Sequence, residues 1–109
     1  MVRIGSCLEA PQDRRTLSTW LAPEDFVDLV WRVFDAPFLG CPVVYGASAN
    51  DAGWWDNSGV AYLGWTPKRN AAAFADRFAD QQPSTGASIS ETCQGGHFVL
   101  EPIAQPNAQ

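Results

Sequence analysis

The chain has 109 residues, of which 46% are hydrophobic and 12% aromatic, and its formal net charge is −5 at pH 7. This composition is typical of a single globular domain. The negative charge argues against nucleic acid or an anionic membrane as a partner, and no apolar run reaches the roughly 20 residues of a membrane span. Cys7, Cys41 and Cys93 form no CxxC pair. We therefore expect a cytoplasmic protein with reduced thiols, without a disulfide framework or a metal site.

Two strands with a helix between them are expected in the first half of the chain. Residues 1–5 and 43–46 are apolar and β-rich and show no polar alternation, which is typical of parallel strands covered on both faces. Residues 24–35 predict a helix, because Pro23 and two acids stand at its start. Strand, helix and strand form a βαβ unit with a right-handed crossover. Residues 6–19 predict a polar loop at the carboxyl end of the first strand, where α/β proteins place ligand sites.

The helix over 24–35 is expected to bury one apolar stripe. The stripe at helical spacing consists of Phe26, Val30, Val33 and Phe34, and Val27 widens it. On the polar side, Asp28 and Arg32 are spaced to form an ion pair across one turn.

The second half begins with the polar loop 47–51, and the Trp54-Trp55 pair follows. The tryptophans could form a stacking platform for a sugar, although the area of an indole ring favours a core position for at least one of them. A short helix then ends at Gly64, and Asp56 and Asn57 are placed to cap its start. Residues 71–81 predict an amphipathic helix anchored by the side chains Phe74 and Phe78. Residues 82–109 predict an irregular tail with a short apolar segment at 97–100.

The usual catalytic and cofactor motifs are missing from the sequence. There is no GxGxxG turn for a pyrophosphate. Lys68 is the only lysine and Gly64 stands four residues before it, so no Tyr-x-x-x-Lys pair exists. His97 is the only histidine, and we interpret it as a surface residue. No residue of the chain is therefore expected to be catalytic.

Ser6 and the Arg14-Arg15 pair are the residues that suggest a ligand. A hydroxyl at a strand end and a guanidinium in the same loop could converge on a carboxylate, which arginine binds with two parallel hydrogen bonds. The alternative is that these arginines are solvated or pair with acids such as Asp13. Residue types alone favour the alternative.

A resemblance changes this balance. It is carried by the blocks RIGSC at 3–7, RTLSTWL at 15–21, VVYGASAN at 43–50, WWDN at 54–57, LGWTP at 63–67 and QGGHF at 94–98. In these blocks the chain resembles the C-terminal part of uronate dehydrogenases, which belong to the extended short-chain dehydrogenase/reductase (NAD-dependent epimerase/dehydratase) superfamily. The match is collinear from residue 2 to about residue 99.

The resemblance implies an enzyme that oxidises C1 of a cyclic hexuronic acid, galacturonate or glucuronate, to an aldarolactone and transfers hydride to NAD. Ser6 matches a serine that hydrogen-bonds the substrate, and Arg15 matches an arginine that binds its C6 carboxylate. Phe98 matches an aromatic residue that closes the substrate pocket. Cys7 is expected near the nicotinamide carboxamide. The resemblance also implies a homo-oligomer, and it leaves Arg14 as a solvated neighbour.

The expected fold class is therefore α/β: the C-terminal βαβ-plus-helices portion of an extended Rossmann-type reductase, without the dinucleotide-binding half. Residues 1–81 would be the substrate-side portion and 82–109 the tail. Such a chain is expected to be a truncated uronate dehydrogenase that is inactive alone, with NAD bound only by the parent enzyme. Two alternatives stay open: a non-catalytic module that binds sugar acids or another protein, and a fragment of another sugar (nucleotide) epimerase or dehydratase.

Overall fold

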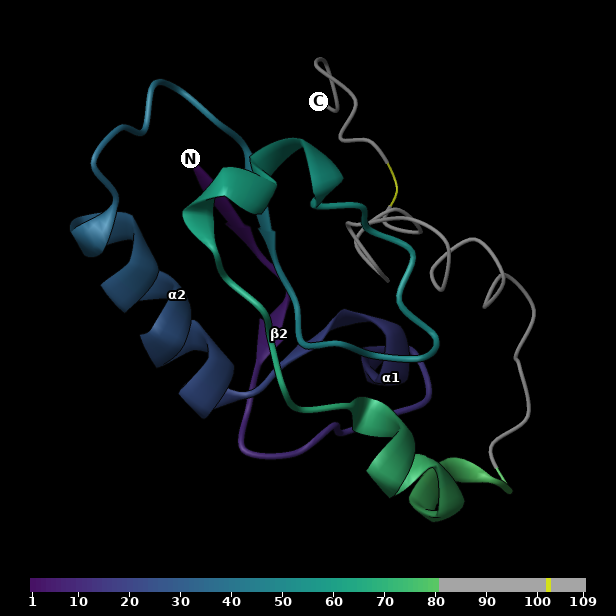
Figure 1. Cartoon of the computed structure of the whole chain (residues 1–109). Helices are drawn as coiled ribbons and strands as arrows, with labels where there is room; N and C mark the ends of the chain where they lie inside the picture. Colours follow the sequence, from purple (N-terminus) through teal and green to yellow (C-terminus); the bar gives the residue numbers. More distant parts are fainter. Residues whose placement is uncertain (81–101, 103–109) are drawn as a thin grey trace, which may run out of the picture.

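The computed structural model describes residues 1–80 and Pro102 (Figure 1). Its elements follow one another as β1 (Val2–Ile4), β2 (Ser6–Cys7), α1 (Thr16–Thr19), β3 (Trp20–Leu21), α2 (Pro23–Asp35), β4 (Val44–Gly46), η1 (Ser58–Leu63) and η2 (Ala71–Phe78), where η marks a 3-10 helix. The fold class is α/β, as predicted. Apart from Pro102, the tail predicted over 82–109 lies outside the described residues, and so does its apolar segment 97–100.

The two predicted strands pair as expected. β1 and β4 are parallel, with Val2 opposite Val44 and Ile4 opposite Gly46, and α2 lies between them in sequence. Cover on both faces is expected from the further strands and helices of the parent enzyme; in this chain, all three residues of β1 are exposed.

The loop predicted over 6–19 is more ordered than expected. Its first residues form β2, which pairs in parallel with β3, so that Ser6 lies opposite Trp20. Its last residues form the short helix α1. Gly5 joins the two strand pairs: its N–H donates to the carbonyl oxygen of Gly46 at 2.8 Å, and a Cβ at this position would clash with the carbonyl oxygen of Thr19. A glycine is therefore required where the chain passes from one strand pair to the other.

Helix α2 runs from Pro23 to Asp35, within one residue of the prediction, and its Asp28 and Arg32 pair at 3.6 Å as expected. The predicted buried stripe was wrong in part. Leu29 is fully buried against Val44 and Leu63, and Val33 packs beside it, whereas the predicted core residues Val27, Val30 and Phe34 are exposed. The helix carries two apolar stripes, and helical spacing does not say which of them faces the strands.

The short helix after the tryptophan pair is η1, and Gly64 ends it with a left-handed φ of 71°. The predicted cap was right for Asp56, whose carboxylate accepts from the N–H of Ser58 at 2.8 Å. This bond and a second one from the Ser58 hydroxyl lower the pKa of the Asp56 carboxyl. The predicted cap was wrong for Asn57, because its side chain instead exchanges two hydrogen bonds with the backbone of Tyr45.

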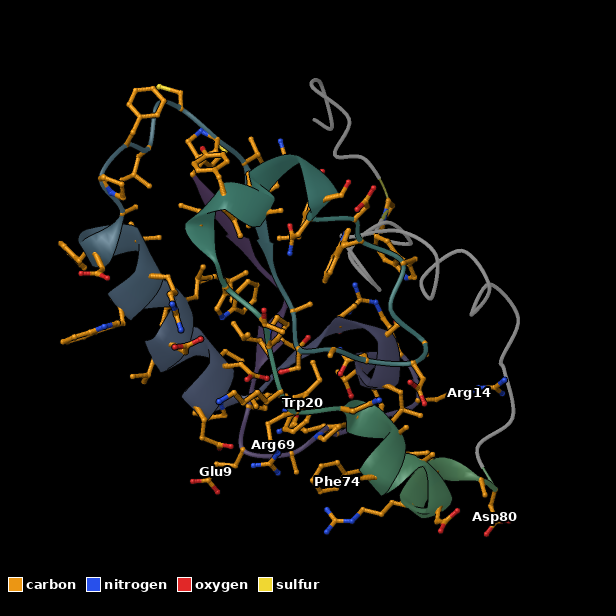
Figure 2. All side chains as sticks on the ribbon, in the orientation of Figure 1. Glu9, Arg14, Trp20, Arg69, Phe74 and Asp80 are labelled. Carbon is orange, nitrogen blue, oxygen red and sulfur yellow. The ribbon has the colours of Figure 1, made fainter. Side chains whose placement is uncertain are left out.

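The second predicted amphipathic helix is η2, which lies beside α1. Its Phe74 points at the fully buried Trp20, ring edge to ring face, with centroids 5.3 Å apart (Figure 2). Trp20, Ala22 and Ala71 form one small core here, and Leu29, Val44 and Leu63 form the other. Among the described residues, no helix is long and apolar enough to cross a membrane.

Candidate functional site

Ser6 and Arg15 line one cavity of about 160 Å³, although they are nine residues apart in the chain. Ser6 comes from β2, and Arg15 stands immediately before α1. The cavity is completed by the residues Arg3, Ile4, Gly5, Thr19 and Trp55. The β2–β3 pairing creates this arrangement, because it folds the loop between the two strands back onto β2.

Ser6 is held from the side by a buried neighbour. Its Oγ lies 3.0 Å from Oγ1 of Thr19, which is almost completely buried. This contact links the ends of β2 and α1, and it orients a half-buried hydroxyl at the cavity wall. A hydroxyl that already has one partner keeps a donor or acceptor position for a ligand.

The backbone that carries Arg15 is fixed by its neighbours in the loop. Thr16 donates its N–H to the carboxylate of Asp13 at 2.8 Å, and its hydroxyl oxygen accepts from the N–H groups of Gln12 and Asp13. Just inside α1, both the N–H and the hydroxyl of Ser18 donate to the carbonyl oxygen of Arg15. The half-buried Arg15 side chain therefore projects from a rigid turn.

The charge of the cavity favours an anion. Arg3 and Arg15 both line it, and none of the aspartates and glutamates in the described part of the chain does. Two guanidinium groups beside one hydroxyl can bind a carboxylate in the planar, two-bond geometry typical of arginine. Sequence reasoning gave Arg3 no role, because a single arginine in a short β-strand carries no signal of its own; only the cavity brings it next to Arg15.

Arg14 differs from Arg15 in position. Its side chain is exposed, and it lines a separate surface cavity with Arg15, Ser18 and Trp54. Arg15 therefore borders both cavities, whereas Arg14 does not line the cavity that contains Ser6.

The tryptophan pair forms a stacked aromatic wall beside the cavity. The ring of Trp55 is parallel to that of Tyr45, with centroids 5.9 Å apart, and Trp54 meets Trp55 at an angle of 61°. Trp55 is half-buried and Trp54 is exposed, so neither ring occupies the core position that was expected for at least one of them. The indole N–H of Trp55 is buried and has no hydrogen-bond partner among the residues that the structure describes. Trp55 also borders a neighbouring cavity of about 220 Å³ that contains Trp65.

Of the other two residues assigned a role from the resemblance, the structure describes only Cys7. Cys7 is exposed, follows Ser6 on β2 and does not line the cavity. Phe98 lies outside the described residues, as does His97. In the part of the chain that the structure describes, no cluster of acidic, histidine and cysteine side chains could hold a metal ion. The sequence holds no glycine-rich turn, so these residues do not fit a dinucleotide by themselves.

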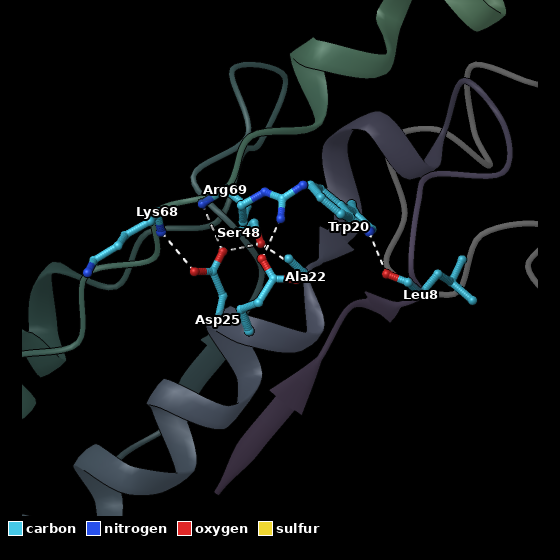
Figure 3. A network of polar contacts seen from close by, with 8 residues as sticks. Leu8, Trp20, Ala22, Asp25, Ser48, Lys68 and Arg69 are labelled. Carbon is cyan, nitrogen blue, oxygen red and sulfur yellow. Dashed lines mark hydrogen bonds and ion pairs between the residues drawn. The ribbon is translucent and has the colours of Figure 1, made fainter.

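A buried carboxylate outside this cavity was not foreseen (Figure 3). Asp25, only 4% exposed, accepts hydrogen bonds from the Ser48 hydroxyl at 2.6 Å and from the N–H groups of Lys68 and Arg69. Its carbonyl oxygen accepts from the indole of Trp65 at 3.0 Å. These contacts fasten the segment after η1 to the start of α2. From sequence, Asp25 is indistinguishable from an acid that only faces the helix dipole.

Comparisons with known proteins bear on this geometry. No protein-family model matches the chain. The chain is 54% identical over 104 residues to uronate dehydrogenase from Agrobacterium fabrum (strain C58 / ATCC 33970), a match that covers 94% of this chain and 39% of that protein. It superposes with a TM-score of 0.85 on glucuronic acid dehydrogenase from Chromohalobacter salexigens, at 41% identity, covering 100% of this chain and 41% of the other.

A variant of uronate dehydrogenase from Agrobacterium tumefaciens, solved in complex with NAD, gives a TM-score of 0.84 at 53% identity. That match covers 95% of this chain and 40% of the other. The chain therefore spans about two fifths of the length of the relatives that it matches. By sequence and by fold, the chain is related to the uronate dehydrogenases over nearly its whole length.

Proposed function

We propose that this chain is the C-terminal, substrate-binding portion of an NAD-dependent uronate dehydrogenase, and that its cavity binds the C6 carboxylate of a hexuronic acid. The observation that carries the proposal is the cavity shared by Ser6, Arg3 and Arg15, which is cationic and has no acidic residue among the described residues of its lining. The similarity to uronate dehydrogenases supports the substrate class.

In the proposed reaction, C1 of the cyclic uronate is oxidised to the aldarolactone, and its hydride passes to NAD. Arg15 binds the carboxylate at the far end of the sugar through two parallel hydrogen bonds. Ser6, oriented by Thr19, adds a hydrogen bond to the substrate. Anchoring one end of a rigid ring sets the position of C1, so these residues contribute by orientation rather than by proton transfer. Phe98 as a lid over the substrate, and Cys7 near the nicotinamide, belong to the same proposal.

The remaining requirements of the reaction are assigned to the part of the relatives that this chain does not match. These are a dinucleotide site and a base that takes the C1 hydroxyl proton. Residues 1–81 then form the substrate side of the complete enzyme, which we expect to be cytoplasmic and oligomeric.

The proposal is tested in a chimera, in which this chain replaces the matching stretch of the Agrobacterium fabrum enzyme. We expect the chimera to form NADH with galacturonate or glucuronate. Arg15→Ala should raise KM by about 30- to 1000-fold, equivalent to about 2–4 kcal/mol, because a charged two-bond contact is lost. Steady-state kinetics measures KM and kcat separately, and the larger effect should fall on KM.

Arg14→Ala is the matched control, since it removes the same charge from the adjacent residue outside the Ser6 cavity. We expect it to change KM by less than about threefold, as for an exposed charge. Equal effects of the two substitutions would assign the carboxylate contact to neither arginine in particular. An inactive but folded chimera would contradict the proposed enzyme context.

A further inference from the structure

Trp55 is the aromatic side chain in the described lining of the Ser6–Arg15 cavity. Apart from Trp55, the described lining consists of two arginines, a serine, a threonine, a glycine and an isoleucine. The proposed function uses the guanidinium of Arg15 and the hydroxyl of Ser6, which bind the polar groups of a sugar acid. It leaves open what contacts the faces of the sugar ring, where the C–H groups lie.

Trp55 lies on the face of the β1–β4 pair that is turned away from α2. Val44 of β4 faces α2, since it packs against Leu29. Side chains alternate along a strand, so Tyr45 points to the opposite face, and so does Arg3, its register partner on β1. The ring of Trp55 is stacked on that of Tyr45, with the two planes inclined by 3°. Trp55 and Arg3 therefore approach the cavity from the same side of the sheet.

Hydrogen bonds hold the segment that carries Trp55. Two residues further on, the side-chain amide of Asn57 donates to the carbonyl oxygen of Tyr45 at 2.8 Å, and its side-chain oxygen accepts from the N–H of Tyr45 at 2.9 Å. Before the tryptophan pair, a turn is closed by the N–H of Gly53, which donates to the carbonyl oxygen of Asn50 at 2.9 Å. Trp55 thus forms a preformed wall, and little order has to be gained when a ligand binds to it.

An indole ring complements the part of a sugar that arginine and serine do not bind. A pyranose directs its hydroxyl groups outward and leaves C–H groups on its two faces. The face of an aromatic ring is partly negative and attracts the positive ends of C–H bonds, while the contact also removes apolar surface from water. Ile4 is the other large apolar residue of the described lining, but it alternates with Arg3 along β1, so its side chain points to the α2 side of the sheet.

We propose that Trp55 contacts the sugar ring of the bound hexuronic acid, with one face of the pyranose against the indole surface that lines the cavity. The inference rests on the proposed function, in which Arg15 binds the C6 carboxylate. A carboxylate contact alone leaves the ring free to turn about its C5–C6 bond. A flat wall beside the ring removes that freedom, so the two contacts together fix the position of C1.

The chimera with the Agrobacterium fabrum enzyme tests the proposal. Trp55→Leu keeps an apolar side chain but removes the flat surface. It should lower kcat/KM for galacturonate about 10- to 50-fold, as expected for the loss of roughly 50–100 Å² of apolar contact. Trp55→Phe keeps an aromatic plane and removes only the indole N–H and part of the ring, and it should lower kcat/KM by less than about fivefold.

Trp54→Leu is the matched control, because it makes the same change at the adjacent, exposed ring, which does not line the Ser6–Arg15 cavity. We expect it to lower kcat/KM by less than about threefold. If Trp55→Leu does not fold, Trp55→Met takes its place as an apolar side chain without a flat face.

A carboxylate without a ring separates the two contacts. Propionate, used as a competitive inhibitor, should inhibit Trp55→Leu as well as it inhibits the unsubstituted chimera, whereas Arg15→Ala should weaken its inhibition. Equal losses of kcat/KM for Trp55→Leu and Trp55→Phe, or for Trp55→Leu and Trp54→Leu, would overturn the proposal, and so would weaker propionate inhibition of Trp55→Leu. Failure of the proposed function is distinguishable from these outcomes, because the unsubstituted chimera would then form no NADH, or Arg15→Ala would have no effect.

Discussion

At the scale of single residues, Asp25 connects more of the molecule than any sequence pattern indicates. Its two carboxylate oxygens receive three hydrogen bonds, from the Ser48 hydroxyl and from the N–H groups of Lys68 and Arg69. The Ser48 oxygen in turn accepts from the N–H of Ala22, which precedes α2. Three segments far apart in the chain thus meet at one buried carboxylate, which makes its substitution informative.

Asp25→Asn should lower the free energy of unfolding by about 1–3 kcal/mol, because an amide offers only one acceptor oxygen and leaves a buried donor unpaired. Urea unfolding measures the change, and hydrogen exchange should show loss of protection at the amides of Lys68 and Arg69. Asp28→Asn is the control, since Asp28 forms a partly exposed ion pair with Arg32 and should change stability by less than about 1 kcal/mol. Similar losses for both variants would mean that the network around Asp25 contributes little.

The residues of the candidate site were accessible from sequence to different degrees. Spacing alone did not show whether Arg15 contacts a ligand or is a solvated charge. The ligand contact was predicted only from the resemblance. The place of Arg3 in the cavity could not be predicted, because the sequence of a single strand does not show which residues of other segments will line a cavity with it. Trp20 was not predicted as core either: it lies in a two-residue strand, too short for an alternation pattern to be visible.

At the scale of elements, α2 shows what a helical pattern can and cannot predict. Its first residue, Pro23, and its acidic first turn fix the start, and the predicted bounds hold within one residue. Its buried side does not follow from the same pattern, because Leu29 and Trp31 both belong to apolar stripes. The choice is made by the strand that the helix meets, and Leu29 is the residue that faces Val44.

Helix η2 gives a test of its two predicted anchors. Phe74 packs against Trp20 and lies under the guanidinium of Arg77 at 4.9 Å. Phe74→Ala should destabilise the chain by about 2–3 kcal/mol, less than a fully buried phenylalanine, because Phe74 is half-buried. Phe78→Ala removes an equal volume near the end of the helix, where burial is also partial, and should cost less than half as much. Urea denaturation followed by tryptophan fluorescence compares the two; a larger loss for Phe78 would place the anchor of η2 at its other end.

At the scale of the whole molecule, the chain matches about two fifths of the length of its relatives. The proposed function assigns the dinucleotide site and the base to the part of the relatives that it does not match. The 109-residue chain alone should neither bind NAD nor reduce it in the presence of galacturonate, since its sequence holds no pyrophosphate-binding turn and no Tyr-x-x-x-Lys pair. Titration calorimetry and NADH absorbance measure both properties. Micromolar NAD binding, or NADH formation, would refute the assignment of the cofactor site to the unmatched part.

The two cores of the described residues are small. One is built around Trp20 and the other around Leu29, and each contains three buried hydrophobic residues. The sheets have two strands each, a size that is marginal in water, and β1 is exposed along its whole length. An uncovered strand edge also favours association with other chains. These features predict low stability for the isolated chain.

We expect the isolated chain to unfold below about 60 °C in a broad transition, because its two cores are small and its sheets have two strands each. Circular dichroism melting with simultaneous light scattering measures the midpoint, the width of the transition and any association of the chains. A sharp transition above about 60 °C from a monodisperse monomer would show that the two small cores suffice, and the chain would then fold as an autonomous domain.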